Sequence, residues 1–302
     1  MSKVKSWSLT AALALVGTVV PLSVPTPAAA QLPPPGSARS WFFAEGNTLP
    51  NWFEFITIIN PDPVNDITVN VDYQLEEPAG TPRGTRGSDV PVPAGQRTTI
   101  AVYDELGRVP GAGAGVGVYT GVSAKLTSAA DFVAERPMYF INNFDVGEVN
   151  GAHDALGVNA ASKTWYFAEG STLTSPAPDN TGVVPGVAGE LRGFIPFWTM
   201  QNVSGANATV RIQYRANNPD RVVEKTISVP DNARVTTDIT NAFNNPAYPG
   251  SLGPGYEGFG AIISSDQPII VERPFYEVHG FPDIAPLING ASVVSGLPDN
   301  CT

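Results

Sequence analysis

Cysteine and histidine are nearly absent from this 302-residue chain. Cys301 is the single cysteine, and His153 and His279 are the only histidines, far apart in the sequence. One cysteine excludes an intramolecular disulfide and a paired-thiolate metal site. So few histidines argue against Ser-His-Asp or Cys-His catalysis, and no serine or cysteine lies in a nucleophile-elbow pattern. We expect Cys301 to be either idle or an intermolecular link, and the sequence leaves both alternatives open.

Charged residues and helical patterns are also scarce. Only 15% of the residues are charged, whereas glycine (30) and proline (29) are abundant. Both residues weaken helices, and no stretch sustains the 3.6-residue apolar period of an amphipathic helix. The formal net charge of -11 repels phosphate backbones, so a nucleic-acid partner is not expected. The composition favours short strands joined by tight turns.

Long apolar runs are missing after the first thirty residues. That N-terminal segment begins with two lysines, continues with an apolar run over residues 9–24 and ends with three alanines. The run is shorter than the roughly 20 residues of a membrane span, so the pattern predicts a secretory signal peptide over residues 1–30. A Pro-rich leader follows over residues 31–40. We therefore expect a secreted, extracellular chain without a transmembrane segment in its mature part, associated with the cell surface only by non-covalent contacts.

Two sequence motifs each occur twice. The first is Trp41–Gly46, WFFAEG, which returns as WYFAEG at Trp165–Gly170. The second is Glu135–Tyr139, ERPMY, which returns as ERPFY at Glu272–Tyr276. The stretch from Val92 to Glu135 has the same spacing, 43 residues, as that from Val229 to Glu272. Equal spacing through divergent sequence indicates that one module has been duplicated.

The duplication predicts the domain organisation. Module 1 covers residues 41–158, a linker covers 159–164, module 2 covers 165–296, and a tail covers 297–302. Module 2 contains an insertion around residues 175–192. Because the linker is short, we expect limited freedom between the modules.

Within each module the apolar residues alternate with a period of two. Val69, Val71 and Tyr73 alternate with polar residues, and the equivalent stretch of module 2 repeats this pattern. Such short, turn-punctuated segments predict an all-β chain of two tandem β-sandwich modules, immunoglobulin-like, with about six or seven strands each. Separate strands are expected over residues 122–127 and in the stretch that carries the Glu-Arg-Pro motif. Because proline lacks a backbone N–H, we expect the second of these strands to end, bulge or lie at a sheet edge at its proline. Only residues 104–107 and 240–244 are expected to form a turn of helix.

The charged residues of the motifs are expected to be structural. Glu45 and Glu169 occupy the same place in both copies, which a fold determinant requires and an active site does not. Glu135 and Arg136 lie on opposite faces of their strand, as do their equivalents, so they cannot pair with each other. We predict an ion pair inside each module between the strand glutamate and an arginine. The predicted structural set is Trp41, Glu45, Arg97, Glu135, Arg136, Trp165, Glu169, Arg234, Glu272 and Arg273.

An enzyme is not expected, and neither a cofactor nor a metal is predicted. A glycosidase would need a carboxylate pair such as Glu45 with Asp104 or Glu135, about 5 to 10 Å apart in an open cleft. The oxygens of Asp62, Asn65 and Asp66 could bind calcium, but they lack the spacing and glycine of an EF-hand loop, and a solvated turn is the favoured interpretation.

Aromatic residues near loops are the candidate ligand-binding set. Exposed aromatic rings are favoured at recognition surfaces, and several β-sandwich modules stack sugars on them. The candidates are Trp52, Tyr119, Tyr248 and Tyr256. They favour the alternative hypothesis of a carbohydrate- or cell-envelope-binding module.

Together the two motifs resemble those of a β-sandwich repeat of unknown function found in secreted and surface proteins of actinobacteria and related bacteria. Such repeats open with Trp-Tyr/Phe-Phe-Ala-Glu-Gly and close with a hydrophobic strand that ends in Glu-Arg-Pro/Met-aromatic-Tyr/Phe. The similarity covers Trp41 to about Gly157 and Trp165 to about Gly296. The resemblance implies extracellular repeat modules and no catalytic residues.

The expected function is that of a secreted, non-catalytic tandem-repeat protein in cell-surface structure, adhesion or assembly. The expected partners are other surface proteins, a further copy of the chain itself, or envelope polysaccharide. Carbohydrate or envelope binding through loop aromatics is the alternative.

Overall fold

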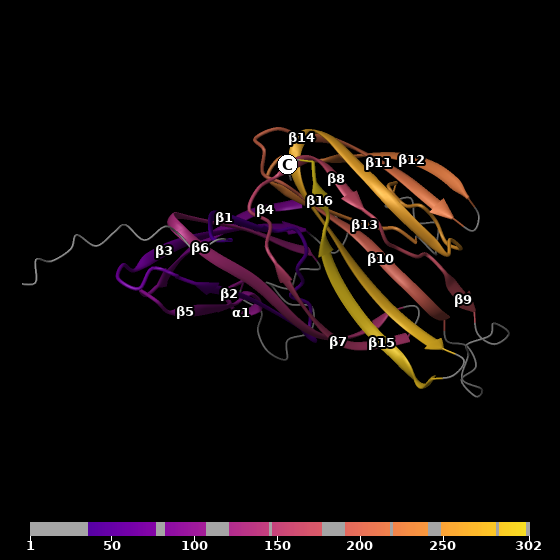
Figure 1. Cartoon of the computed structure of the whole chain (residues 1–302), viewed down its shortest axis with the longest axis horizontal. Helices are drawn as coiled ribbons and strands as arrows, with labels where there is room; N and C mark the ends of the chain where they lie inside the picture. Colours follow the sequence, from indigo (N-terminus) through magenta and orange to yellow (C-terminus); the bar gives the residue numbers. More distant parts are fainter. Residues whose placement is uncertain are drawn as a thin grey trace, which may run out of the picture. The chain divides into compact units, whose positions relative to one another are not determined.

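The computed structural model confirms an all-β chain of two antiparallel β modules with almost no helix (Figure 1). It describes residues 36–76, 82–106, 121–144, 147–176, 191–217, 220–240, 249–281 and 284–299. The expected signal peptide, Tyr119, Tyr248 and Cys301 lie outside these ranges. Within them, no helix has the length and apolar character that a membrane span requires.

Module 1 contains seven strands, as the alternation predicted. They are β1 (Ala38–Phe43), β2 (Trp52–Ile59), β3 (Ile67–Glu76), β4 (Pro82–Val92), β5 (Arg97–Ala101), β6 (Gly121–Phe144) and β7 (Gly147–Leu156). The only described helix, α1 (Val102–Glu105), is a single turn that begins two residues before the turn expected at residues 104–107. Apart from residue 240, the other expected turn, at residues 240–244, lies outside the described residues. One layer has the order β4-β3-β6-β1 and the other β5-β2-β6-β7.

Module 2 repeats this topology with nine strands, more than predicted. They are β8 (Ser162–Phe167), β9 (Thr174–Pro176), β10 (Leu191–Asn202), β11 (Ala208–Asn217), β12 (Arg221–Val229), β13 (Ala233–Asp238), β14 (Gly258–Phe281), β15 (Ile284–Ser295) and β16 (Leu297–Pro298). Its layers have the orders β12-β11-β14-β8-β16 and β13-β10-β14-β15. The two additional strands, β9 and β16, are the shortest of the described strands.

One long strand serves both layers of each module. β6 and β14 are each 24 residues long, and each pairs with strands of one layer in its first part and of the other layer in its second. The sequence had suggested two separate strands here. An immunoglobulin sandwich builds its two sheets from different strands, so this shared strand is a departure from that arrangement.

The tryptophan of the first motif stabilises the point where the long strand changes layer. The indole N–H of Trp41 donates to the carbonyl of Phe132 at 2.8 Å, and that of Trp165 donates to the carbonyl of Ile269 at 3.0 Å. Both rings are buried in the core of their own module. A buried indole N–H needs an acceptor, and this equivalent contact supplies one in both copies.

The proline of the second motif interrupts a ladder without ending its strand. Pro137 lies inside β6, between β2 and β7, although a strand end, bulge or edge had been expected there. The β2–β6 pairing stops opposite Arg136 and Pro137 and resumes in the same register. The β10–β14 pairing stops in the same way opposite Pro274. A missing backbone N–H is thus accommodated by a local gap in one ladder.

Three predicted boundaries differ from the structure. Residues 38–40 of the expected leader belong to β1, which pairs with β6. Residues 162–164 of the expected linker begin β8. Residues 297 and 298 of the expected tail pair with β8 as β16. Local composition did not reveal these pairings, because each partner is distant in sequence.

The two modules fall in one compact unit and share two apolar clusters. In the first cluster, Trp52 and Phe140 of module 1 contact Ile195 and Tyr276 of module 2. In the second, Phe42 and Ala44 of module 1 contact Ile270 of module 2. Burial of these side chains supplies a hydrophobic term for module association.

Candidate functional site at the module interface

The glutamate of the first motif pairs with the arginine of the second motif within each module. Arg136 Nη2 lies 2.9 Å from Glu45 Oε2, and Arg273 Nη2 lies 2.6 Å from Glu169 Oε2. An internal ion pair was predicted, but its acid was wrong. The strand glutamates, Glu135 and Glu272, face away from their neighbouring arginine and do not reach it.

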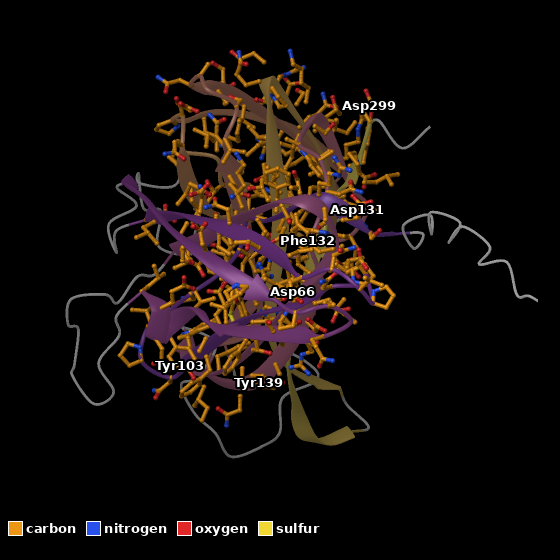
Figure 2. The ribbon with its side chains drawn as sticks, turned by 90° about the vertical axis from the view of Figure 1, so that its left-hand side faces the viewer. Asp66, Tyr103, Asp131, Phe132, Tyr139 and Asp299 are labelled. Carbon is orange, nitrogen blue, oxygen red and sulfur yellow. The ribbon has the colours of Figure 1, made fainter. Side chains whose placement is uncertain are left out.

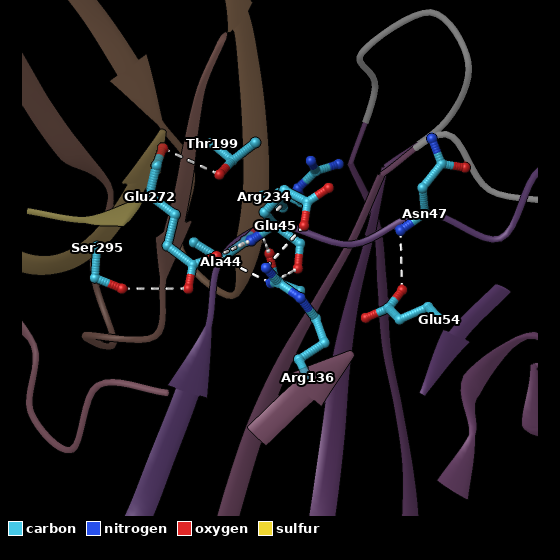
Figure 3. A network of polar contacts seen from close by, with 10 residues as sticks. Ala44, Glu45, Asn47, Glu54, Arg136, Thr199, Arg234, Glu272 and Ser295 are labelled. Atoms are coloured by element: carbon cyan, nitrogen blue, oxygen red, sulfur yellow. Dashed lines mark hydrogen bonds and ion pairs between the residues drawn. The ribbon is translucent and has the colours of Figure 1, made fainter. Parts of the chain in front are cut away.

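Glu272 instead crosses to module 1. Its Oε2 lies 3.0 Å from Arg136 Nη1 and accepts the backbone N–H of Glu45 at 2.7 Å (Figure 3). Arg136 also donates to the carbonyl of Glu45. The side chains of Arg136 and Glu272 have no solvent exposure. Two carboxylates from different modules therefore share one buried guanidinium.

Arg234 crosses from module 2 as well. Its Nη1 lies 3.0 Å from Glu76 Oε2, and its Nε donates to the carbonyl of Ala44 at 2.9 Å. The other interactions of Glu76 come from Thr236, whose N–H and hydroxyl donate to it at 3.1 and 2.6 Å. A buried amide pair, Gln201 to Gln74 at 2.5 Å, lies in the same interface. Every buried charge in this group has an opposite partner, as burial requires.

Together these contacts define a docking groove on module 2. We use that name for the surface between Arg234 and Glu272 on the outward face of the β13-β10-β14 layer, where Thr199 pairs with Thr236 and with Glu272. Ala44, Glu45 and Gly46 of module 1 lie in it, held at the Ala44 carbonyl and the Glu45 N–H. This Ala-Glu-Gly segment is the end of the first sequence motif.

Gly46 is required by close packing. A Cβ there would lie 2.5 Å from Glu54 Oε1 and 2.5 Å from the carbonyl oxygen of Val122. Its carbonyl accepts the N–H of Val122 at 2.9 Å, and Gly170 makes the equivalent contact with Phe259 at 2.7 Å. The motif glycine therefore positions the segment against the long strand of its own module.

Burial and charge shape the protonation of this group. Burial raises the pKa of Glu54 well above its usual value, although Arg136 lowers it. Desolvation lowers the pKa of Arg136, but Glu272 and Glu45 outweigh it and the net pKa is raised. The Glu54 carboxyl accepts the N–H of Asn47 at 2.9 Å. The charged guanidinium of Arg136 therefore lies between the carboxylates of Glu45 and Glu272, while burial favours the neutral form of the neighbouring Glu54.

The hollow beside the docked segment is small. A cavity of about 130 Å³ is lined by Glu45, Trp52, Arg234 and Tyr276, among others. Small-molecule sites usually measure about 300 to 1,000 Å³. A glycosidase would need Glu45 with Asp104 or Glu135, and only Glu45 lines this cavity. Glu45 is buried against Arg136, whereas Glu135 is exposed on the opposite face of β6 and Asp104 is exposed in α1.

Module 1 presents the equivalent docking groove to solvent. Arg97 and Glu135 occupy the places of Arg234 and Glu272, and both are exposed. The Arg97 guanidinium donates to the hydroxyl of Thr99, on its own strand, at 3.0 Å. A hollow of about 430 Å³ lies between them, lined by Thr57, Ile58, Ile59, Arg97, Val133, Glu135 and Pro137.

Aromatic residues continue this exposed face. Phe53 is 40% exposed and Tyr139 52%. Tyr103 makes edge contacts with Phe53 and Phe55, each with ring centroids 5.5 Å apart. Phe55 also meets Tyr139 at 6.2 Å, and Figure 2 labels Tyr103 and Tyr139 at one edge of module 1. This group is the exposed aromatic surface that the sequence placed elsewhere.

The predicted exposure of Trp52 and Tyr256 is wrong. Trp52 is buried, stacked on Phe140 with a centroid distance of 4.4 Å and edge-on to Tyr276 at 5.9 Å. Tyr256 belongs to the core of module 2, and its hydroxyl accepts from Arg221 at 3.3 Å. The position of Trp52 before a strand did not reveal that module 2 covers its ring. The position of Tyr256 in a loop did not reveal that its ring belongs to the core.

The candidate calcium residues form a turn, as the sequence favoured. Asp62 Oδ1 accepts the N–H of Val64 at 2.8 Å, and Oδ2 accepts the side-chain amide of Asn65 at 2.8 Å. Asp66 accepts the N–H of Ala94 at 2.8 Å. The hydrogen bonds that Asp62 accepts, of which that of the Asn65 side chain has the largest effect, lower the pKa of Asp62. No group of three or more potential metal-binding side chains occurs in the part of the chain that the structure describes.

Sequence reasoning missed Glu54, Glu76, Gln74 and Gln201. A signal existed for Glu54, which has the same strand parity as the core residues Ile56 and Ile58. No comparable signal existed for the other three, because their side chains point outward from their own module.

Comparisons with known proteins add little to this site. No family model matches the chain, and no curated protein matches it. Among solved structures it is similar to Thermotoga maritima 1070, with 12% identity, a TM-score of 0.30, and coverage of 46% of this chain and 96% of that one. It is also similar to the Anabaena sensory rhodopsin transducer, with 17% identity, a TM-score of 0.25, and coverage of 37% and 92%. Similarities this low carry no argument about function.

Proposed function

We propose that the chain is a secreted, non-catalytic two-module protein that acts in cell-surface structure, adhesion or assembly. The observation that carries this proposal is the use of the motif residues. The contacts that join the two modules bury Glu45, Arg136 and Glu272. The charges of these residues therefore stabilise the fold and the interface. A face of module 1 with exposed apolar and charged residues is available to partners.

Exposed apolar faces of this kind support a contact role. Scattered surface hydrophobics need no explanation, whereas a contiguous patch rimmed by polar residues marks an interaction site. Phe53, Ile59 and Tyr139 are exposed on one face, with Arg97 and Glu135 beside them. Aromatic, arginine and aliphatic groups together are typical of protein contact surfaces.

Co-sedimentation with envelopes of the producing organism tests this function. The chain is expected to pellet with the envelopes, and Tyr139→Ala is expected to reduce the bound fraction. Val222→Ala is the matched control, because Val222 is also exposed but lies on β12 of module 2. The proposal would be contradicted if the chain stayed in the supernatant when mixed with intact envelopes and this supernatant degraded a polysaccharide.

Carbohydrate binding is the second candidate, favoured by the Phe53, Phe55, Tyr103 and Tyr139 cluster. Ring faces stack on sugars as well as on protein side chains. Soluble envelope polysaccharide should then compete with the envelopes and release the bound chain, whereas protease treatment of the envelopes should leave binding unchanged. The opposite pattern would assign the contact to a surface protein.

A further inference from the structure

The strand registers establish which residues of the two modules are equivalent. In module 1, Thr57 pairs with Thr99 on one side and with Glu135 on the other. In module 2, Thr199 pairs with Thr236 and with Glu272 in the same way. The neighbouring pair, Ile59 with Arg97, corresponds to Gln201 with Arg234. The outward faces of the two layers therefore match residue by residue.

These equivalent faces differ in what covers them. On module 2 the face is buried by module 1: Gln201 and Glu272 are 0% exposed and Arg234 is 3%. On module 1 the face is open: Ile59 is 47% exposed, and Arg97 and Glu135 are exposed. The same architecture thus has one occupied docking groove and one open groove.

The counterpart of the docked segment belongs to module 2. The groove of module 2 holds Ala44–Gly46, whose equivalent in module 2 is Ala168–Gly170. Ala168 and Glu169 are exposed, and the Glu169 side chain is 64% exposed. Module 2 thus presents an exposed Ala-Glu-Gly segment, and module 1 presents an open groove. This groove is equivalent to the one on module 2 that holds Ala44–Gly46.

We propose that the open groove of module 1 docks the Ala168–Gly170 segment of a second copy of the chain. This inference rests on the proposed function in assembly and specifies its partner. It continues an interface that already exists inside the chain. Because the surfaces on the two copies differ, the contact is heterologous, and repeated docking builds an open filament or a closed ring.

Charge complementarity supports this partner. Glu135 takes the place of Glu272, where it would accept the N–H of Glu169 and pair with Arg273. Arg97 takes the place of Arg234, where it would donate to the carbonyl of Ala168. The acid that Arg234 meets, Glu76, corresponds to Asn217 in module 2, on the evidence of equivalent β3 and β11 pairings. One ion pair of the internal interface is therefore replaced by a neutral contact.

That replacement makes the intermolecular contact the weaker of the two. The internal interface also benefits from being in one chain, which raises the effective concentration of its partner. We expect reversible association that grows with concentration, in contrast to the permanent internal contact.

Sedimentation velocity over a wide concentration range tests the association. The protein is used as its host produces it, and the unchanged chain is expected to form concentration-dependent oligomers. Glu135→Arg, on the exposed groove, should weaken association roughly tenfold or more by placing like charge against Arg273. Val222→Arg is the control, an exposed β12 site outside the face, and should associate like the unchanged chain. Monomers at all concentrations would overturn the proposal.

Thiol crosslinking tests the identity of the two surfaces. Glu135→Cys and Glu169→Cys are placed in separate Cys301→Ser chains, which are then mixed and treated with a short bifunctional thiol reagent. The proposal predicts mixed 135–169 dimers in excess of either homodimer. Predominant 135–135 dimers would indicate two copies of the module 1 face packed together and would overturn the head-to-tail arrangement. An absence of dimers in chains that remain folded would overturn it as well.

The envelope assay separates this inference from the function on which it rests. If Glu135→Arg abolishes oligomers and envelope binding persists, the inference holds and self-association is not needed for attachment. If envelopes bind but no oligomer forms in the unchanged chain, the inference fails while the function stands. If oligomers form but envelopes never bind, assembly stands without a surface role.

Discussion

The two modules share a fold, a register and two motifs, yet the same positions have opposite environments. Glu272 and Arg234 are buried in module 2, whereas Glu135 and Arg97 are exposed in module 1. Conversely, Glu45 is buried in module 1 and its equivalent, Glu169, is exposed. Position in the module fixes the geometry of a side chain, and the neighbouring module decides whether it is buried.

This comparison separates two kinds of repeated residue. The Trp–carbonyl bond and the pair of first-motif glutamate with second-motif arginine occur in both copies, so they belong to the module itself. The strand glutamate and the arginine after the turn gain ion pairs only in module 2, so their role depends on a docked neighbour. A duplicated residue can thus be structural in one copy and available in the other.

Arg136→Met should have the largest effect. It leaves Glu45 and Glu272 buried without their shared cation, and removing one member of such a buried group costs about 3 to 5 kcal/mol of unfolding free energy. Chemical denaturation measures the loss. Arg97→Met is the control, because the exposed Arg97 should change stability by no more than about 0.5 kcal/mol. Equal losses in the two variants would contradict the difference between the interfaces.

His153 should contribute an acid sensitivity located on module 1. Burial, with a further contribution from Arg136, lowers its pKa from 6.5 to about 3 in the folded chain, against small raising effects of Glu272 and Asp154. The unfolded chain therefore binds the extra proton between these values, so stability falls as pH falls below about 6.5. At pH 5 this residue should cost about 2 kcal/mol relative to pH 7.

His153→Leu removes that proton and provides the measurement. Unfolding free energies of the variant should fall less than those of the unchanged chain between pH 7 and pH 5. Parallel losses in both chains would mean that the imidazole remains hydrated in the folded state.

Arg273→Met should have a smaller effect than Arg136→Met. Its partner Glu169 is largely exposed, so water can solvate the carboxylate after the arginine is lost. Pairs with an exposed member contribute roughly 1 kcal/mol or less. The ratio of the two losses, measured by denaturation under the same conditions, reports how strongly module 2 desolvates the Arg136 group. A loss as large as that of Arg136→Met would show that the two ends are equivalent.

Much of the fold could be predicted from the sequence, because it depends on local patterns. The alternation of apolar and polar residues predicted β3 and β11, and the repeated spacing indicated the duplication. The motif tryptophans were predicted to be structural, and each donates a hydrogen bond to a carbonyl of the long strand. The shared long strand was missed, because a bend between two apolar stretches looks like a loop in sequence.

The interface could not be predicted for a different reason. Gln201 alternates with core residues as a solvent-facing side chain does, and Arg234 follows a turn as an exposed arginine does. Their partners, Gln74 and Glu76, are more than a hundred residues away. Burial that depends on a second surface leaves no period in either strand. Trp52 was misassigned in the same way, since module 2 completes its environment.

Thiol labelling at Ile59 and Gln201 tests the central comparison most directly. Each position receives a cysteine in a Cys301→Ser chain, and the reaction with a small thiol reagent is followed in the folded, dilute protein. Ile59→Cys, on the open face, should react like an exposed thiol, whereas Gln201→Cys, on the covered face, should be strongly protected until the chain unfolds. Equal fast rates at both positions would show that the modules are not docked, and would contradict the account.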